Sequence, residues 1–348
     1  MRYFDAIEHI RCLVRGEDVY NDEFFKYLLR SECLYLLSKS KQSATKVALP
    51  ISVNSIICNN RYQICKNVMH ALREIPYANI KGAILSSRIY ENPAFRLSGD
   101  IDLLVSPDNS ARVKEILTRN DFVQGRLTGN QIVPYTREEL IYQKSFTHQL
   151  APFVKYTGNK ACPFVSIDVN LGVVWGEALF SIDMNEFLTH TQHFEIFGVT
   201  ISRLQPIWEF IALCMHHYKD MNSIFLIAEH GLKLSEYCDI YFYLVNVKPN
   251  AARLASVSKQ YGLDKYVYYC IYYANEIFND PSLIEYLNEL DSKEAQALLN
   301  CYGLSPEERH EWRVSFFDRL FNNKFKFDFY SSLSEKAKNK IKLNRDFM

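Results

Sequence analysis

The amino-acid sequence predicts an α+β fold in which a small mixed sheet is flanked by N-terminal helices and a C-terminal helical domain. Three observations support this prediction. Apolar residues recur at three- and four-residue steps through much of residues 1–75, which is the spacing of one helix face. Strand-like and helical runs alternate between residues 76 and 205, as in an α/β core. The helical spacing returns in the remainder of the chain, residues 206–348.

The N-terminal segment, residues 1–75, is expected to hold helices over residues 3–15, 22–38 and 54–75. The polar stretch at residues 38–43 interrupts the apolar spacing and predicts a loop. The third helix should end before Pro76, because a residue that precedes proline avoids the helical region.

The core, residues 76–205, is expected to contain strands at residues 79–81, 101–105, 164–169 and 194–201, and helices at residues 83–90 and 108–119. The C-terminal domain is expected to contain helices at residues 207–218, 224–246, 250–260 and 264–277. Residues 324–330 alternate charged and aromatic side chains and favour an edge strand or a contact with a partner. The charged stretch at residues 334–340 predicts a solvated helix or a frayed end.

Charge and cysteine usage restrict the class of protein. Forty basic residues balance forty acidic ones, which argues against a long nucleic acid as partner, because such binding needs a basic face. The nine cysteines form no C-x-x-C pair, so we expect reduced thiols, not a zinc site or a disulfide framework. The first residues lack a signal-peptide pattern and no run of about 18 apolar residues occurs. We expect a cytoplasmic protein that does not enter a membrane.

A pair of acidic residues carries the clearest chemical signal. Asp100 precedes the predicted strand at residues 101–105, and Asp102 is its second residue. Side chains two apart on a strand project to the same face. Two adjacent carboxylates repel each other unless a cation lies between them, and such oxygen ligands suit Mg²⁺ or Mn²⁺. The alternative, a solvent-facing turn before a strand, remains open for this pattern taken alone.

Nearby residues favour a site for phosphate. Ser98 and Gly99 allow a close approach of the backbone, and Lys81-Gly82-Ala83 lies at a predicted strand-to-helix junction, where backbone N–H groups attract anions. Asp168 lies within an apolar strand pattern, where an unpaired charge is unfavourable. It is a candidate third metal ligand, or else the partner of a buried arginine.

The run from Lys81-Gly82 to Arg96, followed by residues 99–105 (G-D-I-D-L-L-V), resembles a bacterial nucleotidyltransferase family with a K-G…R-x-x-G-D-I-D-L-L-V signature. This family belongs to the polymerase-β-like superfamily. The similarity extends more weakly to Asp168 and to the helical block at residues 204–217. It covers roughly residues 75–245 and is specific over residues 80–105.

The resemblance implies transfer of an NMP from an NTP, with ATP the expected donor, to a hydroxyl or other nucleophile on a small molecule, peptide or protein, with release of pyrophosphate. It also implies that Asp100, Asp102 and Asp168 hold two divalent metal ions. One ion lowers the pKa of the acceptor hydroxyl and the other neutralises the triphosphate. The residues expected to bind the nucleotide are Lys81, Gly82, Ser86, Arg88, Arg96, Ser98 and Gly99. For Arg96 a structural ion pair with one of the aspartates stays open, and the helical spacing of Arg88 also allows a solvent-facing position.

Two departures from the family pattern leave rival functions open. Ala83 replaces the serine that usually follows the glycine, and Asn170 stands where related chains often carry a histidine. These changes favour a non-catalytic binding or scaffold protein on the same fold. A metal-dependent phosphohydrolase that uses the same carboxylates is the second rival.

We assign no chemical role to two histidine-containing segments. His216-His217 lies on a helical pattern, but a metal site there requires a further ligand at a matching spacing, and we expect none. His148 is interpreted as a histidine that hydrogen-bonds within the fold. The acceptor, the nucleobase and the oligomeric state are not specified by these patterns.

Overall fold

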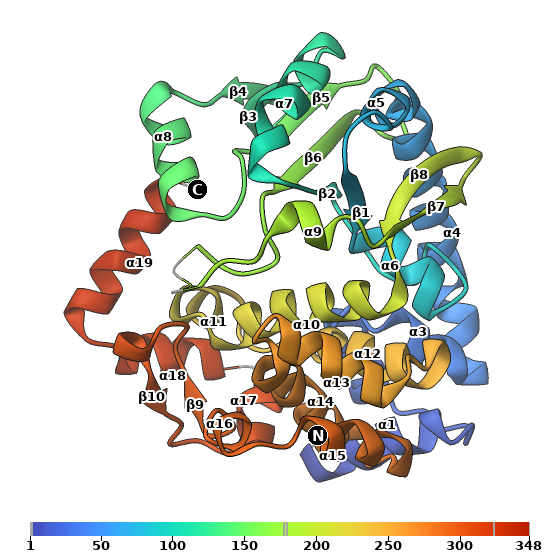
Figure 1. The fold of residues 1–348 in the computed structure, drawn as a ribbon. Coiled ribbons are helices and arrows are strands. Elements are labelled where there is room, and N and C mark those ends of the chain that lie inside the picture. The colour runs from blue at the N-terminus through green and yellow to red at the C-terminus, as the bar shows by residue number, and fades with distance from the viewer. Residues whose placement is uncertain (1–2, 177, 179, 323, 348) are drawn as a thin grey trace. The chain divides into compact units, whose positions relative to one another are not determined.

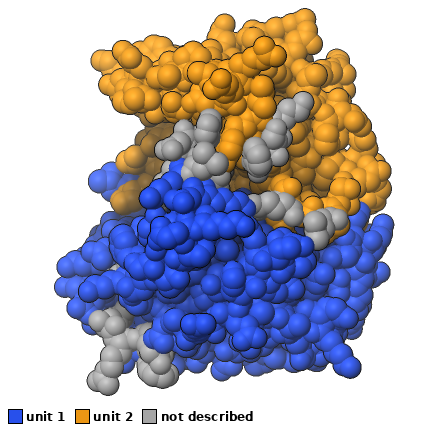
Figure 2. All heavy atoms as spheres, turned by 90° about the vertical axis from the view of Figure 1, so that its left-hand side faces the viewer, with its two compact units in different colours: residues 1–49, 210–346 blue, residues 50–209, 347–348 orange. Residues whose placement is uncertain are grey.

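The computed structural model describes residues 3–176, 178, 180–322 and 324–347, and it confirms the predicted α+β class (Figure 1). Two compact units are present (Figure 2). Residues 50–209 form what we call the sheet unit, and residues 1–49 with 210–346 form the helical unit. Each unit has its own internal packing.

The sheet unit contains a mixed eight-stranded sheet in the order β4-β3-β5-β6-β2-β1-β8-β7. Strands β2 and β6 are parallel, as are β1 and β8, and the other neighbours are antiparallel. The strands are β1 (Tyr77–Ile80), β2 (Ile101–Val105), β3 (Val123–Thr128), β4 (Gln131–Pro134), β5 (Phe153–Tyr156), β6 (Phe164–Asn170), β7 (Thr191–Ile196) and β8 (Val199–Leu204). The helices of this unit that follow β1 are α6 (Gly82–Ile89), α7 (Ser110–Arg119), α8 (Arg137–Phe146) and α9 (Met184–Phe187).

Alternation along the strands separates a core face from a polar face. Ile101, Leu103 and Val105 of β2 pack in one buried cluster. The cluster also contains Val165, Ile167 and Val169 of β6, together with apolar residues of α4 (Lys41–Ile64), α5 (Lys66–Leu72) and α7. Successive side chains of a strand point to opposite faces, so Asp102 and Asp168 project from the other side of the sheet. The core thus fixes the direction in which the acidic residues point.

The helical unit combines both ends of the chain. Its helices are α1 (Tyr3–Val14), α2 (Asp22–Arg30), α3 (Leu34–Lys39), α10 (Pro206–Asn222), α11 (Ile224–His230), α12 (Leu234–Phe242), α13 (Ala251–Gln260), α14 (Asp264–Phe278), α15 (Ile284–Leu290), α16 (Lys293–Gln296), α17 (Phe316–Phe321), α18 (Phe325–Ser332) and α19 (Glu335–Phe347). Helix α1 packs against α14 and α17. Arg11 donates hydrogen bonds to the carbonyls of Ile277 (2.8 Å) and Glu276 (2.9 Å), which ties the first helix to α14.

Several helices follow the predicted bounds, but one predicted loop is wrong. Residues 3–15, 83–90, 250–260 and 264–277 correspond to α1, α6, α13 and α14 within one or two residues. The loop predicted at residues 38–43 is reduced to Ser40, because α4 already begins at Lys41. The hydroxyl of Ser40 accepts a hydrogen bond from the N–H of Ser43 (3.5 Å) and caps the new helix.

Two predicted strands also require correction. The strand predicted at residues 194–201 is a hairpin of β7 and β8, because Phe197 (φ +51°) and Gly198 (φ +69°) form its turn, a conformation that favours two-residue hairpins. The predicted strand at residues 324–330 is helix α18. Phe325 and Phe329, four residues apart and buried in one cluster with Ile227, lie on one helix face.

Two further observations concern membrane-spanning helices and disulfides. Among the described residues, no helix combines the length and the apolar character needed to cross a bilayer. In the same part of the chain the nine cysteines are all free thiols, and seven of them are buried. The structure therefore contains no disulfide among these residues.

Candidate functional site

The register of two parallel strands brings two of the predicted carboxylates together. Asp102 of β2 is the direct partner of Asp168 of β6, and both side chains project from the polar face of the sheet. Asp100 lies two residues before Asp102, at the entry to β2. The three carboxylates proposed from the sequence as metal ligands therefore lie at one place on the sheet.

Burial and mutual repulsion disfavour the ionised form of two of these carboxylates, Asp100 and Asp168. Burial, followed by the charge of Asp102, raises the pKa of Asp100 above its usual value. Burial and the charges of Asp100 and Asp102 raise the pKa of Asp168 to about 7. Repulsion between neighbouring carboxylates has this effect when no cation screens it. The donor set, three oxygen ligands in a strained electrostatic setting, fits a hard divalent cation.

Lys81 supplies the positive charge that faces the carboxylates. Its ammonium lies 3.0 Å from Oδ1 of Asp102, and the two side chains are only 13% and 9% exposed. Lys81 follows β1, whose Ile80 is paired with Asp102, so the antiparallel register of β1 and β2 places the lysine beside the acidic pair. It lowers the pKa values of Asp100 and Asp168 against the larger effects that raise them.

The corner between β1 and α6 requires glycine. Lys81 (φ +58°) and Gly82 (φ +47°) are consecutive residues in the left-handed region, which is unfavourable for a residue with a side chain. A Cβ atom on Gly82 would lie 3.0 Å from Oγ of Ser98. The loop before β2 thus packs directly on the start of α6.

Two residues that the sequence did not single out hold the acidic segment in place. Arg61 of α4, which is 6% exposed, donates from Nη1 to the carbonyls of Ser98 (3.0 Å) and Asp100 (3.4 Å). Ser98 in turn donates to a carboxylate oxygen of Asp100 (3.1 Å). Because Arg61 lies some forty positions away from this segment in the chain, only the folded structure reveals the contact.

Asn170 has a structural role next to the carboxylates. Its Nδ2 donates to Oδ1 of Asp102 (3.3 Å) and to the carbonyl of Leu103 (3.2 Å), and its Oδ1 accepts from Gln149 (2.6 Å). A neutral amide at this position therefore orients Asp102 through a buried hydrogen bond. Outer groups of this kind commonly fix the ligands of a metal site.

The other predicted nucleotide-binding residues lie in different surroundings. Ser86 is buried, donates to the carbonyl of Asn92 (2.6 Å) and accepts from the N–H of Arg96 (3.1 Å). Arg88 forms a buried ion pair with Glu209 (2.7 Å) and donates to the carbonyl of Leu204 (2.9 Å). Arg88 is thus part of the interior, in contrast to the solvent-facing position that its helical spacing had suggested. Gly99 is exposed.

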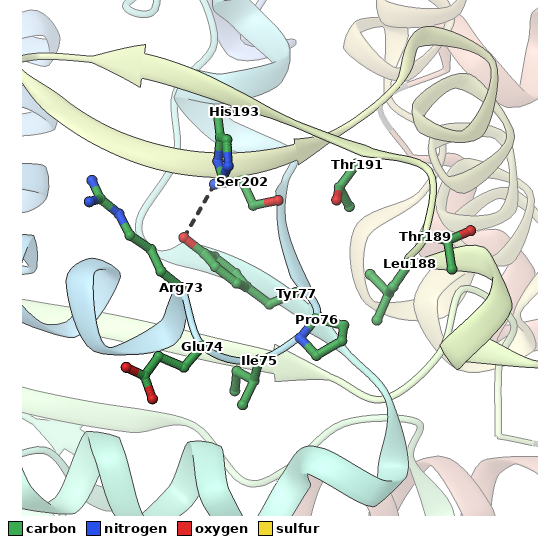
Figure 3. Close-up of a pocket in the computed structure, with 10 residues that line it drawn as sticks. All are labelled: Arg73, Glu74, Ile75, Pro76, Tyr77, Leu188, Thr189, Thr191, His193 and Ser202. Carbon is green, nitrogen blue, oxygen red and sulfur yellow. Dashed lines mark hydrogen bonds between the residues drawn. The ribbon is translucent and has the colours of Figure 1, made fainter.

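A pocket of about 370 Å³ in the sheet unit lies away from the carboxylates (Figure 3). Its lining includes Arg73, Tyr77 and His193, and the Tyr77 hydroxyl accepts a hydrogen bond from the N–H of Ser202 (3.2 Å). Tyr77 is paired with Val105, at the end of the β1–β2 ladder opposite to Asp102. The pocket is therefore not part of the acidic site.

The helical unit contains a second group of metal-ligating side chains. His216, His217 and Asp220 of α10 each offer a ligand atom, and these atoms lie within 4.8 Å of one another. The expectation that the histidine pair has no further ligand at a matching spacing is wrong, because Asp220 lies one helical turn after His216. The i, i+4 pattern H-x-x-x-D was the signal in the sequence.

Converging carboxylates beside a glycine corner and a lysine are typical of proteins that bind a divalent cation together with a phosphate group. A family model described as uncharacterised nucleotidyltransferase matches residues 59–279, more than half of the 348 residues. The chain belongs to this nucleotidyltransferase family, and nucleotidyl transfer is the general activity that membership supports. No curated protein matches the chain.

Proposed function

We propose that the protein transfers an NMP from an NTP to a hydroxyl or other nucleophile on a small molecule, a peptide or a protein, with divalent metal ions bound by Asp100, Asp102 and Asp168. The observation that carries the proposal is the direct pairing of Asp102 with Asp168 on one face of the sheet, with Asp100 two residues away. The raised pKa values of Asp100 and Asp168 support it, because a cation relieves this repulsion.

In the proposed reaction the acceptor oxygen forms a bond to the α-phosphorus, and the bond from that phosphorus to the bridging oxygen of pyrophosphate breaks. The electron pair leaves with pyrophosphate, and the acceptor proton is released to water. When bound, Mg²⁺ supplies a lowered pKa for the acceptor hydroxyl and neutralises triphosphate charge. Asn170 and Arg61 keep the carboxylates and their loop in the orientation that binding requires.

We assign contact with the triphosphate to Lys81, Gly82, Ser98 and Gly99. Lys81 is the cation nearest the carboxylates among the contacts described, and an ammonium is a common ligand for phosphate. The start of α6 at Gly82 adds backbone N–H groups and the positive end of a helix. Nucleotide contact by Ser86, Arg88 and Arg96 stays a prediction, as do ATP as the donor and Mg²⁺ as the metal.

A product assay tests the reaction type. Purified protein is incubated with each NTP and Mg²⁺, and phosphate, pyrophosphate, NDP and NMP are measured separately, with glycerol or water as surrogate acceptors. The transferase predicts equal amounts of pyrophosphate and NMP or NMP ester, lost in Asp100→Asn/Asp102→Asn and kept in Glu138→Gln, an exposed acidic control. Phosphate together with NDP, and no NMP or NMP ester, would identify a phosphohydrolase instead. No turnover with no NTP binding would favour the scaffold function.

A further inference from the structure

The end of helix α10 carries a cluster of nitrogen and oxygen donors that the proposed transferase does not use. His216 and Asp220 are four residues apart and therefore lie on the same helix face. Nε2 of His216 is 3.3 Å from Oδ2 of Asp220. His217 is adjacent, with its ring centroid 5.4 Å from that of His216. Three side chains of one helical turn thus converge on α10 in the helical unit.

Neighbouring charged groups hold two members of this cluster. The buried imidazole of His217 has Nε2 3.4 Å from Oδ2 of Asp239 on α12, and the carboxylate of Asp239 is itself buried. Lys219 lies 3.3 Å from Oδ1 of Asp220, so the other oxygen, Oδ2, is the one that faces His216. A carboxylate behind a histidine is a common arrangement around bound metals, where it fixes the ring.

The donor set indicates which metal fits. Two imidazole nitrogens and one carboxylate oxygen suit Zn²⁺ or a similar transition metal, whereas Mg²⁺ prefers oxygen ligands only. Three protein ligands leave one position of a tetrahedral ion for water. Ligand distances of about 2.0–2.2 Å require small side-chain rotations, and the side chains of His216 and Asp220, which are 20% and 23% exposed, have room for them.

We propose that His216, His217 and Asp220 form a Zn²⁺ site in the helical unit, oriented by Asp239 and separate from the carboxylate site of the sheet unit. The two sites differ in donor chemistry and in the unit that supplies their residues. Zn²⁺ therefore binds the histidine cluster independently of Asp100, Asp102 and Asp168.

Titration of the chelator-treated full-length protein with Co²⁺, followed by its visible absorption, tests the site. We expect one Co²⁺ to give the spectrum of a low-coordinate N/O site, to be displaced from that site by Zn²⁺, and to bind there at least about tenfold more weakly in His216→Gln and in Asp220→Asn. His193→Gln, at an exposed histidine, and Asp100→Asn/Asp102→Asn should leave this spectrum unchanged. Zn²⁺ should also raise the Tm of the wild-type protein more than that of Asp220→Asn.

The proposal is overturned if the folded wild-type protein gives no Co²⁺ spectrum, or if His216→Gln and Asp220→Asn bind as tightly as wild type. Thermal unfolding without metal checks that both variants fold, and the partial exposure of the two side chains makes folding the expected result. A spectrum lost only in Asp100→Asn/Asp102→Asn would place the Co²⁺ at the carboxylates and would also contradict the proposal. A loss of transferase activity by itself neither supports nor contradicts the Zn²⁺ site. The experiments can therefore contradict the Zn²⁺ site or the proposed nucleotidyl transfer one at a time.

Discussion

The ammonium of Lys81 lies 3.0 Å from Oδ1 of Asp102, so a cation of the protein contacts one of the three carboxylates that we propose to bind metal. Within the contacts described, the same side chain is the nearest one able to neutralise a triphosphate. Lys81 therefore has two candidate partners, and the carboxylate releases it most easily when a divalent ion takes its place.

Replacing Lys81 by methionine should change the affinities for metal and for nucleotide in opposite directions. Without the competing ammonium, Mg²⁺ alone should bind at least about tenfold more tightly, since a unit charge at this distance contributes a few kcal/mol at an effective dielectric constant of about 20 and about 1.4 kcal/mol is a factor of ten. NTP in the presence of Mg²⁺ should bind more weakly. Calorimetric titration measures both, with Lys155→Met as a control at an exposed ion pair with Asp121. Equal loss of both affinities would argue against the competition.

Replacing Asp168 by asparagine should stabilise the metal-free protein while it removes metal binding. The folded-state pKa of Asp168 is about 7, against about 3.9 in an unfolded chain. At pH values between these two pKa values, the folded state binds more protons than the unfolded state. The contribution of Asp168 to stability is therefore full below pH 4 and is lost as the pH rises through 7. In chelator, wild type should lose stability between pH 5 and pH 8, and Asp168→Asn should lose less. Denaturant unfolding at the two pH values measures this, and the same pH slope for both proteins would contradict it.

Replacing Asn170 by alanine should loosen Asp102. Two donated hydrogen bonds disappear, to Oδ1 of Asp102 and to the carbonyl of Leu103, and the loss of such an outer contact typically weakens metal binding 10- to 100-fold. The control is Asn185→Ala, whose amide bonds the exposed Asp108. Unchanged Mg²⁺-dependent NTP binding in Asn170→Ala would show that Asp102 is oriented by other groups.

Replacing Gly82 by alanine separates backbone strain from a steric clash. The positive φ of +47° is unfavourable for alanine, by about 1–2 kcal/mol, and its Cβ atom would meet Oγ of Ser98 at 3.0 Å. Gly158 has a positive φ of +72° with nothing within 4 Å of its added Cβ atom. Gly158→Ala should therefore lose only the backbone contribution. Chemical denaturation should show a larger loss for Gly82→Ala, together with weaker NTP binding, and equal losses would exclude the clash.

The local sequence predicted the elements that carry the acidic residues, because their signals lie within a few positions. The strand at residues 101–105 is β2, and the helix at residues 83–90 is α6 within one residue. The direct pairing of Asp102 with Asp168 depends on β2 lying beside β6, which are separated by more than sixty residues. Such non-local pairing is not encoded in any short pattern.

The residues that support the site could not be predicted for the same reason, because their contacts are non-local. In the sequence, Arg61 is one of many polar residues on a helical pattern. Only the position of α4 in the fold places it next to the carbonyls of Ser98 and Asp100. Strands β3, β4 and β5 were not predicted because their sequences are short and partly polar. Some of their apolar residues, such as Val123 and Leu127, are exposed in the structure. The hairpin of β7 and β8 was missed because its turn contains a phenylalanine, Phe197.

Isothermal titration with the four NTPs, with and without Mg²⁺, tests the central claim most directly. The account predicts Mg²⁺-dependent binding of an NTP by the wild-type protein, lost in Asp100→Asn/Asp102→Asn and retained in Glu138→Gln. Failure of the folded wild-type protein to bind any NTP, or binding that survives in the double carboxylate variant, would contradict it.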